Sequence, residues 1–279
     1  MFNTLISVNE LLRHKDPENW VIIDCRYDLG DLSSGYESYL KSHIEGAIYA
    51  DIHKDLSGEP VTDSGRHPLP SADKLRRVFS IFGIDEGRQI VVYDSSSGAF
   101  AARLWWLLRF MGHNEVALLD GGWQAWQSTH QAVEAGERMP APRSFEGEPR
   151  MEWLSRIEDI AGARLLVDSR EGQRYRGEIE PIDPVAGHIP GAINRCWKEN
   201  LNESGFFRDS AKLRQQFKQI FAETPASEVV FYCGSGVTAC HNLLAVEHAR
   251  LPAAKLYAGS WSEWCKQADR PIATGSEQV

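Results

Sequence analysis

Short runs of apolar residues alternate along this chain with longer segments that have helical periodicity. Uninterrupted apolar runs of this kind are typical of strands buried on both faces, and longer amphipathic segments are typical of helices. We predict strands at residues 20–24, 89–94, 116–120, 164–168, 228–232 and 253–257, and helices at 71–82, 99–111, 210–222 and 237–249. Strands that alternate with helices predict α/β domains with mostly parallel sheets flanked by helices.

The pattern occurs twice. "VIIDCR" at 21–26 corresponds to "LLVDSR" at 165–170, and "HIEGAI" at 43–48 corresponds to "HIPGAI" at 188–193. Four landmark pairs are offset by 144, 145, 139 and 138 residues: Asp24/Asp168, His43/His188, Asp94/Cys233 and Trp123/Trp261. Near-constant offsets in the same order indicate a duplicated domain.

Boundary signals agree with this duplication. The S-x-x-E sequences at 7–10 and 155–158 match capping boxes, and each predicts the start of an entry helix. The segment between the halves is rich in proline, glycine and charge, which is typical of a linker. We therefore predict an N-terminal domain at 1–135, a linker at 136–152 and a C-terminal catalytic domain at 153–279.

Composition narrows the class of protein. The 279 residues are 42% hydrophobic and 25% charged, as in soluble globular proteins of two domains. A formal charge of −9 argues against binding to nucleic acid or an anionic membrane. Neither a spanning apolar run nor a signal-peptide layout occurs, which predicts a cytoplasmic location. Five scattered cysteines without a CxxC pair favour reduced thiols over disulfides or a zinc site: Cys25, Cys196, Cys233, Cys240 and Cys265.

The strongest candidate for chemistry is the loop "YCGSGVTAC" at 232–240. Cys233 ends a predicted strand, Gly234 and Gly236 can adopt positive φ, and a helix is predicted to begin near Val237. The N–H groups of such a turn can form an anion-binding nest, to which the helix N-terminus adds positive charge. This setting favours a reactive thiolate and could hold the outer sulfur of a persulfide. The alternative is a buried core thiol beside a tight turn.

The repeat favours the catalytic interpretation. The first half carries Asp94 where Cys233 stands, so the scaffold does not require a thiol at this position. One half then looks catalytic and the other an inactive copy. A cysteine phosphatase would need an arginine at the sixth position after the cysteine to bind phosphate, and Ala239 stands there. Phosphatase chemistry is therefore disfavoured.

These residues resemble those of the two-domain rhodanese-like sulfurtransferases, and the resemblance covers nearly the whole chain. The loop "CGSGVTAC" looks like the active-site loop of the 3-mercaptopyruvate branch, and four other motifs support it: "HIPGAI", "RYRG" at 174–177, "GRHPLP" at 65–70 and "GSWSEW" at 259–264. The resemblance implies that Cys233 accepts sulfur as a persulfide and passes it to cyanide, thioredoxin or a small thiol. It implies neither a metal nor an organic cofactor.

The resemblance also implies roles for individual residues. Ser235 fits the family's proton-relay position, and His67 fits the histidine that pairs with it. Arg174 matches the arginine that holds the substrate carboxylate, for which a planar guanidinium is suited. The predicted substrate-binding set is Arg174, Gly234, Gly236, Val237 and Thr238.

Simpler interpretations stand beside these roles. Ser235 could be an ordinary turn residue, His67 an exposed loop histidine and Arg174 a surface ion pair. His188 looks structural. The tryptophans at 123, 126, 261 and 264 recur at a spacing of three and predict core packing, as does the position of Cys240 in the helix after the loop.

The sulfur donor is predicted from charge and from the family comparison. Thiosulfate-preferring relatives carry basic residues after the cysteine, whereas the neutral "GSG" here favours 3-mercaptopyruvate. Thiosulfate transfer and a non-catalytic persulfide carrier are the alternatives. The family's acid behind the histidine would fall at His53, which leaves Asp51, Asp63 or no acid. A second substrate arginine would fall near residues 182–183, where neither residue is basic, which leaves Arg66 or Arg103.

Overall fold

The computed structural model describes residues 1–276 and divides the chain into two compact units. Unit 1 comprises Met1–Gly58, Pro70–Arg150 and Glu203–Phe207. Unit 2 comprises Glu59–Leu69, Met151–Asn202 and Arg208–Val279. Residues 277–279, the end of the predicted C-terminal domain, lie outside the described part. A segment of the first repeat, 59–69, thus folds with the second repeat.

Unit 1 is built on a parallel sheet with the strand order β1-β6-β5-β2-β4. The bounds are β1 Leu5–Ile6, β2 Trp20–Asp24, β4 Ile48–Tyr49, β5 Gln89–Tyr93 and β6 Val116–Leu119. A separate antiparallel pair joins β3 (His43–Ile44) to β7 (Val133–Glu134). Every residue of the central strand β5 is buried, as its continuous apolar run predicts.

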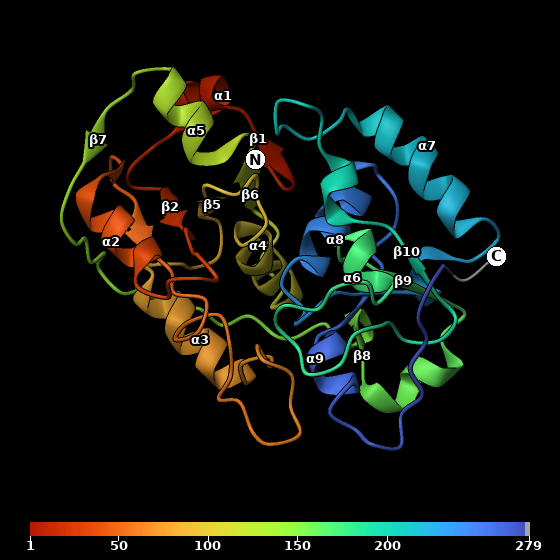
Figure 1. Cartoon of the computed structure of the whole chain (residues 1–279). Helices are drawn as coiled ribbons and strands as arrows, with labels where there is room; N and C mark the ends of the chain where they lie inside the picture. Colours follow the sequence, from red (N-terminus) through yellow and green to blue (C-terminus); the bar gives the residue numbers. More distant parts are fainter. Residues whose placement is uncertain (277–279) are drawn as a thin grey trace. The chain divides into compact units, whose positions relative to one another are not determined.

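Helices cover both faces of this sheet. They are α1 Val8–His14, α2 Ser34–Lys41, α3 Ala72–Ile81, α4 Ala101–Phe110 and α5 Gly122–Ser128 (Figure 1). Leu11 of α1 and Trp126 of α5 belong to one core cluster with Val91 of β5. Helix α4 packs on β5 and β6 and is buried over nearly its whole length.

Unit 2 repeats the topology. Its parallel sheet has the order β10-β9-β11-β12-β8, with β8 Leu154–Ser155, β9 Leu165–Asp168, β10 Ala192–Asn194, β11 Val229–Tyr232 and β12 Lys255–Tyr257. Strand by strand, this is the order of unit 1 read from the opposite edge. The predicted fold class, two tandem α/β domains with parallel sheets, is confirmed.

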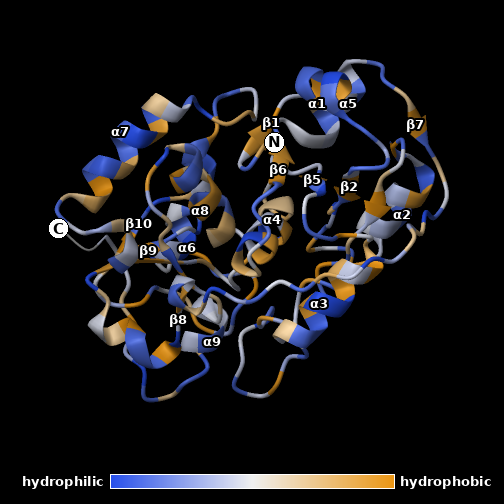
Figure 2. Cartoon of the chain, turned by 180° about the vertical axis from the view of Figure 1, so that it is seen from behind, coloured by the Kyte–Doolittle hydropathy of each residue, from blue (hydrophilic) through white to orange (hydrophobic). Residues whose placement is uncertain are grey.

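Unit 2 has α-helices and short 3-10 turns. The α-helices are α6 Gly172–Tyr175, α7 Ser210–Phe221, α8 Ala239–His248 and α9 Ser260–Trp264. The 3-10 turns are Met151–Trp153, Ile157–Gly162, Trp197–Asn200 and Ala226–Glu228. Figure 2 shows hydrophilic and hydrophobic residues alternating along α7, which buries Leu213, Phe217 and Phe221. Helix α8 packs on β11 and β12. Within residues 1–276, no helix has the length and apolar character needed to cross a membrane.

The two predicted capping boxes have different outcomes. The first is confirmed, because Ser7 Oγ accepts the N–H of Glu10 at 3.2 Å and the Ser7 N–H donates to Glu10 Oε2 at 2.9 Å. The second is wrong, since Ser155 pairs with Tyr257 in the sheet and a 3-10 turn follows it. The Arg156 N–H donates to Asp159 Oδ2 at 2.9 Å, so the carboxylate closes the turn one residue later.

The predicted core positions are confirmed. The four tryptophans at spacing three are buried in the two hydrophobic clusters, Trp123 and Trp126 in unit 1 and Trp261 and Trp264 in unit 2. In each unit an arginine stacks on one of these rings: the Arg26 guanidinium carbon lies 4.6 Å from the Trp123 ring centroid, and that of Arg170 lies 4.9 Å from the Trp261 ring centroid. The duplication therefore includes the polar core as well as the topology.

Candidate active site

The Cys233 loop connects the central strand β11 to α8 at the carboxyl end of the unit 2 sheet. Cys233 is 1% exposed. Its N–H donates to Ser260 Oγ at 3.2 Å, and its carbonyl accepts the N–H of Trp261 at 3.0 Å. The next carbonyl, of Gly234, accepts the Ser262 N–H at 2.9 Å. The start of α9 thus fixes the backbone of the thiol on both sides.

Gly236 shows why the loop needs glycine. Its φ is 74°, and a Cβ there would collide with the carbonyl oxygen of Ala258. The loop then turns into α8, because the carbonyls of Val237 and Thr238 accept the N–H groups of Cys240 and His241 at 3.1 and 3.2 Å. Cys240 is fully buried with its Sγ 3.3 Å from the Gly236 carbonyl oxygen, which confirms its predicted core position.

The structure brings Ser235 and His67 together. His67 Nδ1 lies 2.7 Å from Ser235 Oγ, and the two residues are 4% and 6% exposed. The interpretation of His67 as an exposed loop histidine is therefore wrong. The pair forms because segment 59–69 folds into unit 2, where the Arg66 N–H donates to Ser262 Oγ at 3.0 Å.

The acids considered for His67 have other surroundings. The Asp51 carboxylate accepts the N–H groups of His53 and Lys54 at 2.8 and 2.9 Å, within its own turn in unit 1. His53 Nε2 lies 2.8 Å from the Tyr27 hydroxyl, also within unit 1. Asp63 is exposed. A role for either acid in the relay stays a prediction.

Two arginines flank Gly234, the residue that follows Cys233. A Cβ built on Gly234 would lie 3.0 Å from Nη2 of Arg66 and 3.5 Å from both terminal nitrogens of Arg174. Arg174 Nη2 donates to Glu180 Oε1 at 2.6 Å and to Asp183 Oδ2 at 3.3 Å. Both acids are buried, so the interpretation of Arg174 as a surface ion pair is wrong. Two guanidinium groups are thus held beside the loop.

His188 has the structural contacts that its motif predicts. Its Nδ1 lies 2.7 Å from the carbonyl oxygen of Tyr175, and its ring stacks on the Tyr175 ring at 3.8 Å. In unit 1, His43 contacts Tyr39 in the same way, at 2.8 Å and 4.1 Å. A contact present in both repeats belongs to the scaffold.

Sequence reasoning missed Ser260, Glu180 and Asp183. Ser260 is buried with φ 57°, a left-handed conformation that is uncommon outside glycine. The repeat contained the signal, because "GGW" aligns with "GSW" and sets Ser260 opposite Gly122, whose φ is 54°. Ser260 keeps the strained backbone and supplies the hydroxyl that binds the Cys233 N–H.

The corresponding loop of unit 1 is an occupied anion nest. Oδ1 of Asp94 accepts the N–H groups of Ser96 and Gly98 at 2.7 and 2.8 Å, and Oδ2 accepts those of Phe100 and Ala101 at 2.8 Å each. The Asp94 carbonyl accepts the Trp123 N–H at 2.8 Å, as the Cys233 carbonyl accepts that of Trp261. The unit 1 loop therefore presents four converging N–H groups to a negative charge.

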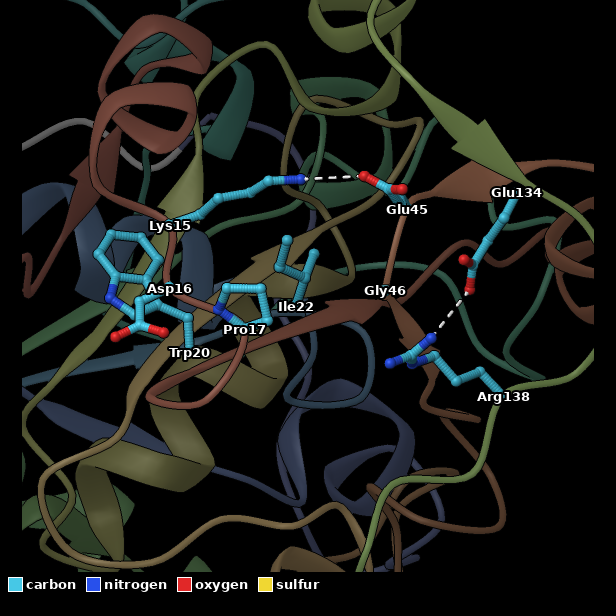
Figure 3. Close-up of a pocket in the computed structure, with 9 residues that line it drawn as sticks. All are labelled: Lys15, Asp16, Pro17, Trp20, Ile22, Glu45, Gly46, Glu134 and Arg138. Carbon is cyan, nitrogen blue, oxygen red and sulfur yellow. Dashed lines mark hydrogen bonds and ion pairs between the residues drawn. The ribbon is translucent and has the colours of Figure 1, made fainter.

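A cavity of about 330 Å³ in unit 1 is a different kind of feature. Figure 3 shows two ion pairs in it, Lys15–Glu45 at 3.4 Å and Arg138–Glu134 at 3.6 Å, beside Trp20. It is lined by none of the predicted site residues and by no cysteine. Across the part of the chain that the structure describes, no group of three or more His, Cys, Asp or Glu side chains is placed to hold a metal ion. The predicted site residues lie instead at and around the Cys233 loop.

Comparison with known proteins agrees with the duplicated fold. Residues 7–129 and 151–267 each match the family described as the rhodanese-like domain. A solved 3-mercaptopyruvate sulfurtransferase from Leishmania major superposes with a TM-score of 0.86 at 30% identity, covering 97% of this chain and 76% of that one. The SseA sulfurtransferase structure from Escherichia coli gives 0.79 at 29% identity, covering 94% and 100%.

Curated relatives are similar over nearly their whole length. A Pseudomonas aeruginosa protein named for 3-mercaptopyruvate sulfurtransfer is 43% identical, covering 97% of this chain and 98% of its own. A Mycobacterium tuberculosis protein named for thiosulfate sulfurtransfer is 35% identical, covering 98% and 97%. The 3-mercaptopyruvate sulfurtransferase of Escherichia coli K12 is 31% identical, covering 96% of each chain. The names agree on sulfur transfer and differ in the donor.

Proposed function

Because this chain belongs to the rhodanese-like domain family and is a two-domain sulfurtransferase, we propose that Cys233 carries the transferred sulfur and that 3-mercaptopyruvate is the preferred donor. The observation that carries this proposal is the pair of equivalent loops. One encloses the Asp94 carboxylate in four N–H groups, and the other presents a thiol at the same position. The second repeat, 153–279, is then the catalytic domain and the first, 1–135, an inactive copy.

In the first step, the Cys233 thiolate attacks the donor sulfur. A new S–S bond forms, and the C–S bond of 3-mercaptopyruvate breaks with its electron pair moving into the enolate of pyruvate. The enolate carbon then takes a proton, so the net products are the Cys233 persulfide and pyruvate. Ser235 and His67, 2.7 Å apart, supply that proton as a relay.

In the second step, the outer sulfur leaves Cys233. While it is bound, its negative charge faces the backbone N–H groups of the loop, for which Gly234, Gly236, Val237 and Thr238 are the predicted donors, by analogy with the N–H groups that bind the Asp94 carboxylate in unit 1. A thiophilic acceptor such as cyanide, thioredoxin or a small thiol attacks this sulfur and releases the Cys233 thiolate. Neither step requires a metal or organic cofactor.

Charge around the loop supports the donor. A 2-oxo acid has one carboxylate, which suits the guanidinium of Arg174. The carboxylates of Glu180 and Asp183 bind the same guanidinium and would oppose the second charge of thiosulfate. Ser235 can deliver a proton to the enolate that 3-mercaptopyruvate leaves, whereas the sulfite that thiosulfate leaves needs no proton on carbon.

A cytoplasmic location stays a prediction from sequence.

A donor comparison at fixed cyanide tests the proposal. We expect a larger kcat/KM for 3-mercaptopyruvate than for thiosulfate, measured as thiocyanate formation by the full chain. A larger value for thiosulfate would establish the second candidate, which the Mycobacterium tuberculosis relative favours by name. A single stoichiometric release of thiocyanate without turnover would instead identify a persulfide carrier.

A further inference from the structure

The cavity of about 330 Å³ in unit 1 continues into a second one of about 190 Å³, because the two share four lining residues. These are Pro17, Trp20, Gly46 and Arg138. Both parts lie at the amino ends of the parallel strands, since Trp20 is the first residue of β2. We propose that this joint cavity binds a nucleoside phosphate, with the phosphate on its arginines and the base on Trp20. The site is independent of the sulfur donor proposed above.

The smaller part of the joint cavity is positively charged. Three arginines line it, Arg88, Arg138 and Arg143, and no Asp or Glu within residues 1–276 is among its lining residues. Arg138 and Arg143 are 51% and 45% exposed, and they pair with Glu134 at 3.6 Å and Asp85 at 2.6 Å. Since a guanidinium has five N–H donors, each keeps donors for a ligand. Arginines placed in this way suit a phosphate, which they bind in bidentate fashion.

Arg88 has a buried donor that the protein leaves unused. Its Nη1 donates to the Gly83 carbonyl at 2.8 Å and its Nη2 to the Pro17 carbonyl at 3.3 Å. Its Nε is buried and has no hydrogen-bond partner in the described part of the chain. Burial and the charge of Arg143 lower the pKa of Arg88. An anion beside Arg88 and Arg143 would relieve the repulsion between their like charges.

The larger part supplies a ring and hydrogen-bond acceptors. The Trp20 ring is half-buried, meets the Phe2 ring edge-on at 6.1 Å between centroids, and lines both parts. Figure 3 shows Asp16 and Glu45 at the same cavity. Aromatic side chains stack on nucleic-acid bases, and ionised carboxylates accept hydrogen bonds from hydroxyl and amino groups. A ligand with a phosphate at one end and a sugar and base at the other matches the two parts.

The linker forms one wall of the joint cavity and is fixed to unit 1. Arg138 and Arg143 both belong to the predicted linker at 136–152. The Arg138 N–H donates to the Tyr39 hydroxyl at 3.0 Å, and the Arg143 N–H donates to the Ser80 carbonyl at 2.9 Å. Helices α2 and α3 thus hold two of the three arginines in place, so a ligand meets a site that is already formed.

Isothermal titration calorimetry of the full chain with AMP tests the proposal. We expect saturable binding, with a Kd at least about tenfold below the Kd values for adenosine and for inorganic phosphate, because AMP occupies both parts. Arg138→Gln and Arg143→Gln should each raise the Kd for AMP about tenfold through the loss of a charge-assisted contact. The matched control is Arg77→Gln, an exposed substitution on α3 that lines neither part and should leave this Kd unchanged.

A second pair of variants separates the ring from the charge. Trp20→Leu should raise the Kd for AMP about tenfold and change that for inorganic phosphate by less than about twofold, because only the base stacks on the ring. Trp20→Phe keeps an aromatic ring and should give an intermediate Kd for AMP. It also provides a folded variant if a thermal melt shows Trp20→Leu to be unstable.

Three results would overturn the inference. One is the absence of saturable binding up to about 1 mM AMP. Another is a Kd for AMP that changes in neither Arg138→Gln nor Arg143→Gln. The third is equal affinity of the wild type for AMP and inorganic phosphate, which would contradict the role of Trp20. None of these measurements depends on sulfur transfer, so they leave the proposed function to its own test.

Discussion

The loops at Asp94 and Cys233 stand at equivalent places in the two units and differ in backbone and in the side chain at their first position. Ser97 and Gly98 have positive φ in the first loop, and Gly236 has positive φ in the second. Each loop follows a buried central strand and leads into a buried helix, and its first carbonyl accepts a hydrogen bond from a tryptophan N–H. In unit 1 the Asp94 carboxylate satisfies four loop N–H groups itself. In unit 2 the equivalent position holds the thiol of Cys233. The first loop is therefore an anion site filled by its own side chain, and under the proposed function the second serves a reaction.

The surroundings of the two loops differ as well. Arg26 in unit 1 binds Asp24, whereas Arg170 in unit 2 binds both Asp168 and Glu180. Glu180 in turn holds Arg174 beside the loop. Gly122 in unit 1 is replaced by Ser260, whose hydroxyl accepts the N–H of Cys233. The second repeat thus has polar groups that the first repeat folds without.

The largest effect is expected from copying unit 1 into unit 2. Cys233→Asp should abolish sulfur transfer from every donor, by at least about a thousandfold, because the nucleophile is lost. The variant should fold, since a carboxylate is the native occupant of the equivalent nest. Thiocyanate formation and a thermal melt measure the two properties. Cys196→Ser, which lies outside the loop, should retain activity, and comparable turnover by Cys233→Asp would contradict the mechanism.

The next effect separates the donors. Ser235→Ala removes the hydroxyl that lies 2.7 Å from His67 and should lower kcat/KM for 3-mercaptopyruvate about a hundredfold. Thiosulfate transfer should fall by less than about tenfold, because sulfite leaves without protonation of carbon. Equal losses for both donors would show that Ser235 positions the loop instead of moving a proton.

The contribution of the Asp94 carboxylate to the fold of unit 1 is tested by measuring the free energy of unfolding. Asp94→Ala leaves four buried N–H groups without their acceptor and should lower the free energy of unfolding by about 3 kcal/mol. Asp94→Asn keeps one acceptor oxygen and should cost less. Urea denaturation gives both values. If Asp94→Ala were as stable as the wild type, the carboxylate could not be the principal ligand of the nest.

The smallest expected effect is on the stability of the fold at low pH. Burial alone would raise the pKa of Glu180, but hydrogen bonds and charge from Arg174 and the N–H groups of Ile182 and Asp183 hold it below the ordinary value of 4.5. A depressed pKa stabilises the fold above the unfolded value, and this stabilisation is lost as pH falls through the folded value.

In Glu180→Gln, the fall in melting temperature below pH 4.5 should therefore be shallower than in the wild type. Glu223→Gln, an exposed substitution in unit 2, should leave the pH profile unchanged. Parallel profiles for the wild type and Glu180→Gln would remove Glu180 from the acid response.

The sequence predicted those parts of the molecule that depend on local pattern. Strand positions, the parallel sheets and the Cys233 loop follow from apolar runs, glycine positions and the repeat. The ion pair between Arg66 and Asp183 joins residues 117 positions apart and depends on segment 59–69 folding with the other repeat. In the sequence, Asp183 marked only the position at which the family's second substrate arginine is absent. In the structure, its carboxylate forms ion pairs with two arginines, Arg66 and Arg174. Ser155 failed as a cap because its backbone is used by the sheet.

Intact mass spectrometry after exposure to 3-mercaptopyruvate tests the central claim most directly. The account predicts one added sulfur atom on the wild-type chain, removed by cyanide with release of thiocyanate, and none on Cys233→Ser. Unit 1 contributes only Cys25, which is buried and whose pKa is raised by burial, so it should not take up sulfur. A sulfur atom retained on Cys233→Ser, or turnover by that variant, would contradict the assignment of Cys233 as the nucleophile.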